Sequence, residues 1–410
     1  MADVRPLAGL RYDPARVGDV ADVIAPPYDV ITPDEQQALY ARSPWNVIRL
    51  ILPREAERGA SAARTLRAWV DDRVLVRDAA PALYFYSQEY GLPDGSRRRR
   101  DGVLCRLRLE AFDRGIVRPH ERTLPGPKAD RLRILRATGA NLSAIFGLYA
   151  RRGEAARDLL DLNVRDAPLL DLRGGHRLWR VTDPARIARF VDALANETIV
   201  IADGHHRYET ALAYRDEQRG NEAAEWVLAY LANMEEEGVV ILPTHRLVRG
   251  PIRPAAEVLA GVAPWFDVVA ANGPRQAGEI DFVVPGRRER LRARPGAQDA
   301  LANVPAAIRR LDLAVLHELV LGRVLGLGVD RLDYTHDDAD AVARVERGEF
   351  AAGFLLNAPT IAQVRDVCFA GELMPEKSTY FYPKLASGLV FSLVGPPWVT
   401  DTSGTGARGS

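Results

Sequence analysis

The chain has 410 residues, with 55 Lys and Arg balanced by 55 Asp and Glu, so its net charge is zero. A neutral chain carries no basic footprint for nucleic acid, and no apolar run approaches the ~20 residues that would span a bilayer. The two cysteines lack metal-ligand spacing, and the length predicts two or three domains. We expect a cytoplasmic protein without nucleic acid or membrane partners; the oligomeric state stays open.

The first segment, residues 1–112, is expected to mix helices with strands. We expect an extended stretch at 23–30, a helix capped by Thr32 and Glu35, a strand at 45–52, a helix at 60–70 and a hairpin of 83–86 with 103–109. The arginine run 97–100 is placed at the hairpin tip, in solvent, because no aromatic residues alternate with it.

The second segment, 113–250, and the third, 251–400, alternate strands with helices, and 401–410 reads as a disordered tail. Expected strands are 144–149, 178–181, 199–202, 227–234, 239–242, 266–269, 282–284, 351–356 and 388–393, and expected helices start at 130, 184 and 306. This alternation predicts an α/β fold with layered sheets and several domains.

The stretch 199–212 is the most informative segment of the sequence. Four apolar residues form an expected buried strand, a Gly turn follows, and Ala211 and Leu212 continue with helical spacing. Backbone N–H groups at such a helix start, together with the helix dipole, favour an anion such as phosphate. The candidate phosphate-binding residues are Asp203, Gly204, His205, His206 and Arg207.

Lysine is rare in this chain, since only three of the 55 basic residues are lysine. Each lysine lies in a proline-containing, turn-like segment. A compact ammonium makes point contacts that the planar guanidinium fork does not reproduce. We therefore expect Lys377 and Lys384 to reach the phosphate site, with Ser378 and Thr379 adding donors, and Lys128 is a weaker candidate.

His120 and Glu121 form the second candidate group. Pro119 precedes them and a hydroxyl residue, Thr123, follows, in a loop before a helix. A carboxylate facing the phosphate site could act as general base toward a substrate hydroxyl. The alternative is a capping or ion-paired glutamate.

Dedicated metal and nucleotide motifs are missing from the sequence. Adjacent histidines point about 100° apart on a helix, and no HxxxH, HxH or CxxC spacing occurs, so we expect no transition-metal site. Magnesium carried in with ADP or ATP stays open, with Asp203 as a possible ligand. Neither a P-loop nor a GxGxxG turn after a strand is present.

Four motifs resemble the domain-of-unknown-function 1015 family, often labelled SpoOJ/ParB-family protein, nearly from end to end. They are Ala25-Pro26-Pro27-Tyr28-Asp29-Val30, His120-Glu121-Arg122-Thr123, Ala202 to Tyr208, and Lys377 to Leu385. The resemblance makes Tyr28 and Asp29 further candidate site residues. It implies no activity.

The middle segment is also similar to the ParB/sulfiredoxin superfamily and its free serine kinases, through Pro119-His120-Glu121 and the turn 203–207. This likeness implies a ParB/sulfiredoxin-like core within the mixed-sheet fold, Glu121 as base toward a serine-like hydroxyl, and nucleotide phosphates at the turn. Because the sulfiredoxin cysteine is missing, sulfinic acid reduction is disfavoured. Three functions stay open: a phosphotransferase of a small hydroxyl metabolite, a phosphohydrolase or nucleotidase, and a nucleotide-binding regulator.

Overall fold

The computed structural model describes residues 1–122, 126–151 and 167–395. The expectations for Thr123 and for the tail 401–410 lie outside the described residues. The chain divides into unit 1, residues 1–118, 123–239 and 383–410, and unit 2, residues 119–122 and 240–382. Strands from both sides of residue 112 share one sheet, and the domain boundaries expected at 112, 250 and 400 stay predictions.

Unit 1 contains helices and strands from both ends of the chain. Its α-helices are α1 (Pro14–Val17), α2 (Pro33–Arg42), α3 (Ile48–Ile51), α4 (Arg58–Asp71), α5 (Gly126–Thr138), α7 (Pro184–Leu194) and α8 (His205–Glu217). Its strands are β1 (Val4–Arg5), β2 (Leu10–Tyr12), β3 (Leu75–Arg77), β4 (Leu83–Gly91), β5 (Arg97–Arg108), β6 (Val117–Pro119, which runs to the boundary with unit 2), β7 (Ala140–Asn141), β8 (Ile145–Tyr149), β9 (Leu170–Leu172), β10 (His176–Val181), β11 (Ile199–Asp203), β12 (Trp226–Asn233) and β21 (Ser392–Leu393).

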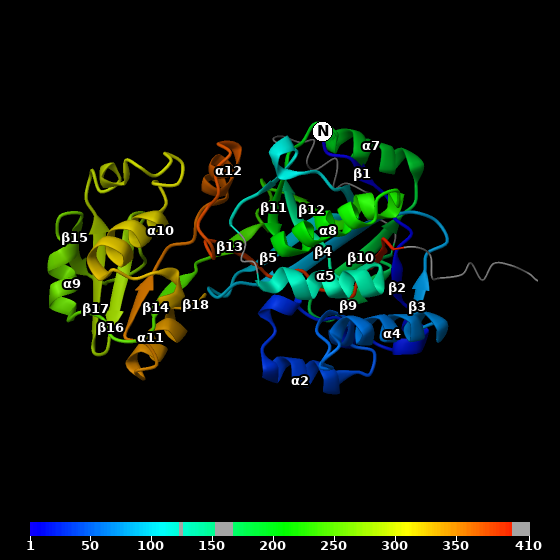
Figure 1. Ribbon diagram of the computed structural model, residues 1–410, viewed down its shortest axis with the longest axis horizontal. Helices are drawn as coiled ribbons and strands as arrows, with labels where there is room; N and C mark the ends of the chain where they lie inside the picture. The colour runs from blue at the N-terminus through cyan, green and yellow to red at the C-terminus, as the bar shows by residue number, and fades with distance from the viewer. Residues whose placement is uncertain (123–125, 152–166, 396–410) are drawn as a thin grey trace, which may run out of the picture. The chain divides into compact units, whose positions relative to one another are not determined.

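A nine-stranded sheet forms the centre of unit 1 (Figure 1). The strand order is β6-β11-β8-β12-β5-β4-β10-β9, and β1 pairs with β5. β8 and β12 run parallel, whereas β4 with β5 and β11 with β8 are antiparallel. The expected α/β architecture with a mixed sheet is confirmed.

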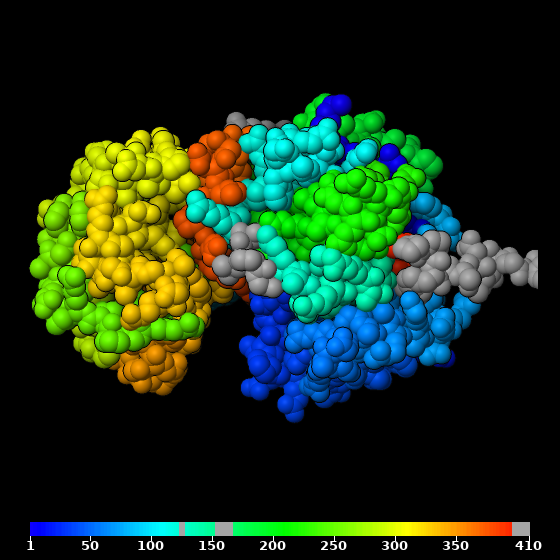
Figure 2. Space-filling view, viewed as in Figure 1, coloured from blue at the N-terminus to red at the C-terminus, as the bar shows by residue number. Residues whose placement is uncertain are grey.

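Helices α7 and α8 cover one face of this sheet. Phe190 of α7 and Tyr208 and Ala211 of α8 share a buried core with Ile199 and Ile201 of β11. Figure 2 shows α8 in green and α5 in cyan side by side on the surface of unit 1, and the two helices pack together. Because β11 and α8 are both anchored in the core, the turn that joins them is held in place.

The helix α2 begins as the sequence predicts. The Thr32 side chain accepts the Glu35 N–H, and the Glu35 carboxylate accepts the Thr32 N–H at 2.8 Å. This confirms the expected capping box.

The strand expected at 45–52 is wrong, because this segment contains helix α3. The Asn46 Oδ1 accepts the Ile48 N–H at 3.0 Å, and the Asn46 amide donates to the carbonyls of Asp22 and Ile24. A side chain that satisfies backbone groups locally favours a helical turn over a strand.

The arginine run lies within β5, and Arg97 to Arg99 are exposed as expected, but Arg100 is not. Arg100 is fully buried, and its Nη2 donates to Gln88 Oε1 and to the Pro383 carbonyl, both at 2.7 Å. Successive strand residues face opposite sides, so Arg100 turns inward while Arg99 stays exposed.

Unit 2 is built on a six-stranded antiparallel sheet with the order β15-β17-β16-β19-β14-β18 (Figure 1). Its strands are β13 (Val240–Leu242), β14 (His245–Val248), β15 (Phe266–Ala270), β16 (Glu279–Val284), β17 (Arg287–Ala293), β18 (Leu332–Thr335), β19 (Ala352–Leu355) and β20 (Tyr380–Tyr382). Its helices are α9 (Ala255–Val262), α10 (Asp312–Val315), a π-helix at Leu316–Leu325, α11 (Asp338–Glu346) and α12 (Ile361–Phe369). The expected helix at 306–325 therefore begins at Asp312, and of the expected strand 388–393 only β21, in unit 1, forms.

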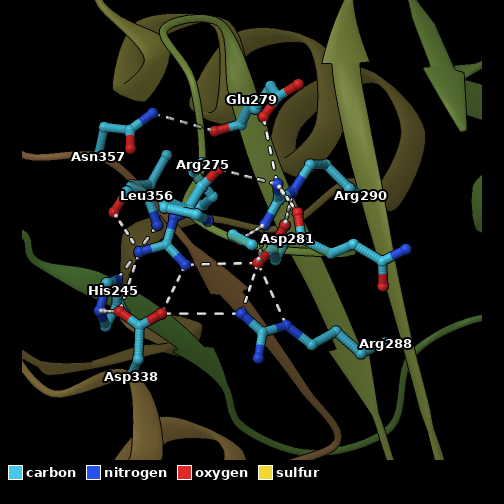
Figure 3. A network of polar contacts seen from close by, with 12 residues as sticks. His245, Arg275, Glu279, Asp281, Arg288, Arg290, Asp338, Leu356 and Asn357 are labelled. Atoms are coloured by element: carbon cyan, nitrogen blue, oxygen red, sulfur yellow. Dashed lines mark hydrogen bonds and ion pairs between the residues drawn. The ribbon is translucent and has the colours of Figure 1, made fainter. Parts of the chain in front are cut away.

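An ion-pair network lies at one end of the unit 2 sheet (Figure 3). Arg290 Nε contacts Asp281 Oδ1 at 2.7 Å, Arg288 Nη2 contacts Asp281 Oδ2 at 2.6 Å, and Arg275 Nη1 contacts Asp338 Oδ2 at 2.6 Å. Burial would raise the pKa of Asp281, but Arg290 and Arg288 hold it below its usual value. The buried carboxylate of Asp281 is thus paired with cations, which avoids the cost of an unpaired buried charge.

Candidate functional site

The turn between β11 and α8 has the geometry that the sequence predicts. The register of β11 against β8 shifts between Ile201 and Asp203, as in a β-bulge, just before the strand ends. Gly204 adopts φ 89° and ψ 29°, in the left-handed region that favours glycine, and α8 begins at His205. The N-cap residue is Gly204 itself, which has no side chain that could cap the helix start. A helix start of this kind directs backbone N–H groups and the positive end of the helix dipole toward an anion.

A buried carboxylate gathers two cations at this turn. Arg207 Nη2 donates to Asp203 Oδ2 at 2.5 Å, and Lys384 Nζ donates to Asp203 Oδ1. Arg207 Nη1 also donates to the carbonyl of Ala144, at the start of β8. The three charged side chains are all largely buried, and together they carry one excess positive charge.

The pKa of Asp203 reflects this arrangement. Burial would raise the pKa, but the charges of Lys384 and Arg207 outweigh burial and hold it well below its usual range. Because both carboxylate oxygens accept from cations, Asp203 does not fit the expected role of a magnesium ligand. Across the described ranges, no group of three or more His, Cys, Asp or Glu side chains could hold a metal ion.

Within unit 1, Lys384 and Lys128 both contact carboxylates at the turn or in the helix that follows it. Lys384 contacts Asp203, and Lys128 Nζ on α5 lies 2.6 Å from Glu209 Oε2, in the second turn of α8. The sequence favoured Lys377 over Lys128. The expectation that Lys377, which belongs to unit 2, reaches the same site stays a prediction.

The segment that bears Tyr28 is joined to the segment that follows Lys384. Ala25 and Ser387 exchange two backbone hydrogen bonds, and Ser387 Oγ lies 2.7 Å from Ser143 Oγ. Tyr28 itself lies in a short 3-10 turn at Tyr28–Val30, not in the extended conformation expected. Asp29, in the same turn, is exposed.

His120 and Glu121 belong to unit 2, where they form a separate cluster with residues near the end of that unit. His120 is buried, and its Nε2 shares a hydrogen bond with Thr379 Oγ1 at 2.6 Å. Glu121 Oε2 lies 3.7 Å from His120 Nε2. This oxygen is buried, and within the described part of the chain it has no hydrogen-bond partner. The expectation that Glu121 faces the turn in unit 1 stays a prediction.

Arg246 holds the Lys377 turn in unit 2, a contact that the sequence did not suggest. Its Nη2 donates to the Lys377 carbonyl at 3.1 Å, and its Nε donates to His317 Nε2 at 3.2 Å. Burial lowers the pKa of Arg246 to about 10 and that of His317 to about 3. The Lys377 side chain is exposed, and the Ser378 hydroxyl donates to the Pro375 carbonyl of its own turn.

The chain belongs to the family described as "Protein of unknown function (DUF1015)", whose pattern matches residues 4–314. The family expected from the motifs is therefore confirmed. Among curated proteins none matches the chain. Among the residues that the structure describes, no helix is both long and apolar enough to cross a membrane.

Solved structures show a weak likeness. A conserved hypothetical protein from Pyrococcus furiosus is 16% identical, with a TM-score of 0.35 over 70% of this chain and 95% of that protein. A free serine kinase in complex with AMP is 15% identical, with a TM-score of 0.35 over 70% and 92%. SbnI from Staphylococcus aureus, truncated at its C-terminus, is 10% identical, with a TM-score of 0.36 over 68% and 84%. The likeness to the ParB/sulfiredoxin superfamily stays a prediction.

Proposed function

We propose that this member of the DUF1015 family binds ADP or ATP by its phosphates at the start of α8 and transfers a phosphoryl group to a small, serine-like hydroxyl metabolite. One observation carries the proposal: Arg207 and Lys384 converge on the buried Asp203 directly before the start of α8. Asp203 orients both cations and lowers the cost of holding them together. A net positive charge then remains for the phosphates.

The residues of the turn would stabilise the transferring group. In phosphoryl transfer the negative charge spreads over the equatorial oxygens, and fixed donors stabilise it without reorganising during the reaction. The N–H groups of His205 to Arg207 and the two cations would supply such donors. Magnesium would be held by the phosphates of the nucleotide, because Asp203 is already engaged.

Glu121 would act as the general base. It would take the proton of the acceptor hydroxyl, whose oxygen bonds to phosphorus while the nucleotide leaves with one phosphate fewer. Its buried Oε2, with no hydrogen-bond partner among the described residues, supports this role, because an engaged carboxylate would be a weaker base. His120, the other catalytic candidate, would orient Glu121 from 3.7 Å.

Calorimetric titration of the wild type, Arg207→Ala and Arg219→Ala with ADP and ATP tests the proposal. Arg219 is exposed, just beyond the end of α8, so Arg219→Ala serves as a control. Arg207→Ala should weaken binding about 10-fold or more, as expected for a lost charge-assisted hydrogen bond of roughly 1.5–3 kcal/mol. Equal affinity in all three proteins would exclude the turn as the phosphate site.

A further inference from the structure

A cavity in unit 1 adjoins the turn at Arg207. The enclosed cavity volume is about 60 Å³, and the unfilled space reaches about 500 Å³ when the open mouth is included. The inner room corresponds to roughly four waters at about 15 Å³ each. It therefore holds one ring of a flat ring system whose remainder lies in the mouth, and it does not hold a whole nucleotide.

Arg131 and Tyr28 form one wall of the cavity. The Arg131 guanidinium carbon lies 3.9 Å from the centre of the Tyr28 ring. Its Nη1 donates to the Ile51 carbonyl and its Nη2 to Asp130, both at 2.5 Å. The Arg131 side chain is only 9% exposed, and its Nε is a buried donor without a hydrogen-bond partner in the described chain. An unpaired buried donor beside a cavity calls for an acceptor on an occupant.

The rest of the lining combines apolar surface with another donor. Ile134 of α5, Leu142 and Val227 supply apolar walls. The Asn141 Oδ1 accepts the Leu228 N–H at 2.8 Å, so the Asn141 amide offers its NH₂ group. An occupant should therefore present an apolar, flat body with acceptor atoms at its edge.

We propose that this cavity receives the base of the nucleotide whose phosphates lie at the start of α8. This inference rests on the proposed function and adds to it where the base binds. Arg207 touches both places, because it lines the cavity and contacts Asp203 of the turn. A nucleobase matches the lining: its ring is planar and apolar on both faces, and its ring nitrogens and carbonyl oxygens are acceptors. The inference also gives the Tyr28 motif a role as a wall of the base site.

The test compares ADP with inorganic pyrophosphate, which has the phosphates but no base. Calorimetry on the full chain should show ADP binding the wild type about 10-fold or more tightly than pyrophosphate, within the range that stacking of a base contributes. Ala140→Leu places three more carbons in the cavity, and Tyr28→Ala removes one wall. Either change should bring ADP down to the affinity of pyrophosphate, while pyrophosphate affinity stays within about twofold. Ala68→Leu, the same enlargement on an exposed position of α4, should leave both affinities unchanged.

The outcomes separate the two proposals. Equal binding of ADP and pyrophosphate by the wild type, or an ADP preference that survives in both cavity variants, overturns the base site and leaves the phosphate site standing. Failure of the wild type to bind either compound overturns the proposed function itself. Thermal unfolding of each variant without ligand shows whether the variant is folded. If Ala140→Leu does not fold, the ADP preference of Tyr28→Ala alone tests the base site.

Discussion

Lys384 donates a hydrogen bond to Asp203 across 181 residues of sequence. The whole of unit 2 except residues 119–122 lies between them in the chain. The segment that returns to unit 1 after residue 382 therefore supplies one of the two cations at the turn. Ser387, three residues later, pairs with Ala25 and fixes this returning segment to the N-terminal part of unit 1.

Replacement of Lys384 should weaken nucleotide binding and leave a buried carboxylate with one cation fewer. We expect Lys384→Met to lower ADP affinity about 10-fold or more, as for Arg207→Ala. Lys384→Arg should lose nearly as much, because the broad guanidinium does not replace a compact ammonium at this buried contact. Lys128→Met should lose less, since Lys128 contacts Glu209 in the second turn of α8 and not Asp203 before the helix start. Calorimetry measures all three, and full affinity in Lys384→Arg would remove the argument from lysine rarity.

Replacement of Gly204 should have two effects that can be measured separately, one on stability and one on nucleotide affinity. An added Cβ would impose strain at φ 89° and would lie 2.9 Å from the Arg207 guanidinium carbon. Gly220 is the matched control, because it has φ 90° but no described atom within 4 Å of an added Cβ.

Both Gly204→Ala and Gly220→Ala should lose about 1–2 kcal/mol of unfolding free energy from the backbone alone. Only Gly204→Ala should also lose nucleotide affinity, because it displaces Arg207. Chemical denaturation and calorimetry measure the two effects, and equal loss of affinity in both variants would contradict the role of Arg207.

Local chemistry made much of the fold predictable from the sequence. The Thr32 capping box, helix α7 and the strand, turn and helix at 199–212 depend on neighbouring residues, and the structure reproduces them. The segment 45–52 was mistaken because its apolar pattern fits a strand, whereas the Asn46 side chain accepts the Ile48 N–H and is itself held by the carbonyls of residues 22 and 24.

Long-range contacts decide what the sequence could not show. Arg100 appears as one of four exposed arginines, and only the folded sheet reveals its buried contacts with Gln88 and Pro383. The rarity of lysine pointed to Lys384, but not to Asp203 as its partner. Arg131 carries no motif at all, and its place beside Tyr28 depends on the packing of α5.

His176 should make stability depend on pH under mildly acidic conditions. Burial, helped by the charge of Arg100, lowers the pKa of His176 to about 4, and its Nδ1 lies 2.6 Å from the Tyr86 hydroxyl. Above pH ~6.5 neither the folded nor the unfolded state holds the proton, so the group has no effect. Between ~6.5 and 4 only the unfolded chain binds it, so the unfolding free energy falls as the pH falls, by about 1.4 kcal/mol per pH unit at most.

We expect His176→Gln to reduce this slope. Urea denaturation at several pH values between 4 and 7, followed by tryptophan fluorescence, measures it in both proteins. Parallel curves for the variant and the wild type would show that His176 is protonated in the folded state as readily as in the unfolded chain.

A substitution of Glu121 distinguishes an enzyme from a protein that only binds nucleotide. Glu121→Gln keeps the size and hydrogen-bonding reach of the side chain but removes its basicity. If Glu121 is the general base, turnover with a hydroxyl acceptor should fall by about 10² to 10⁴, while ADP affinity is nearly kept. Release of product nucleotide and calorimetric titration measure the two quantities on the same preparations.

Loss of both turnover and ADP affinity would make Glu121 a structural residue of the His120 and Thr379 cluster. Full turnover in the variant, with water as the acceptor, would favour a phosphohydrolase. A wild type that binds nucleotide but turns over no acceptor would be a regulator.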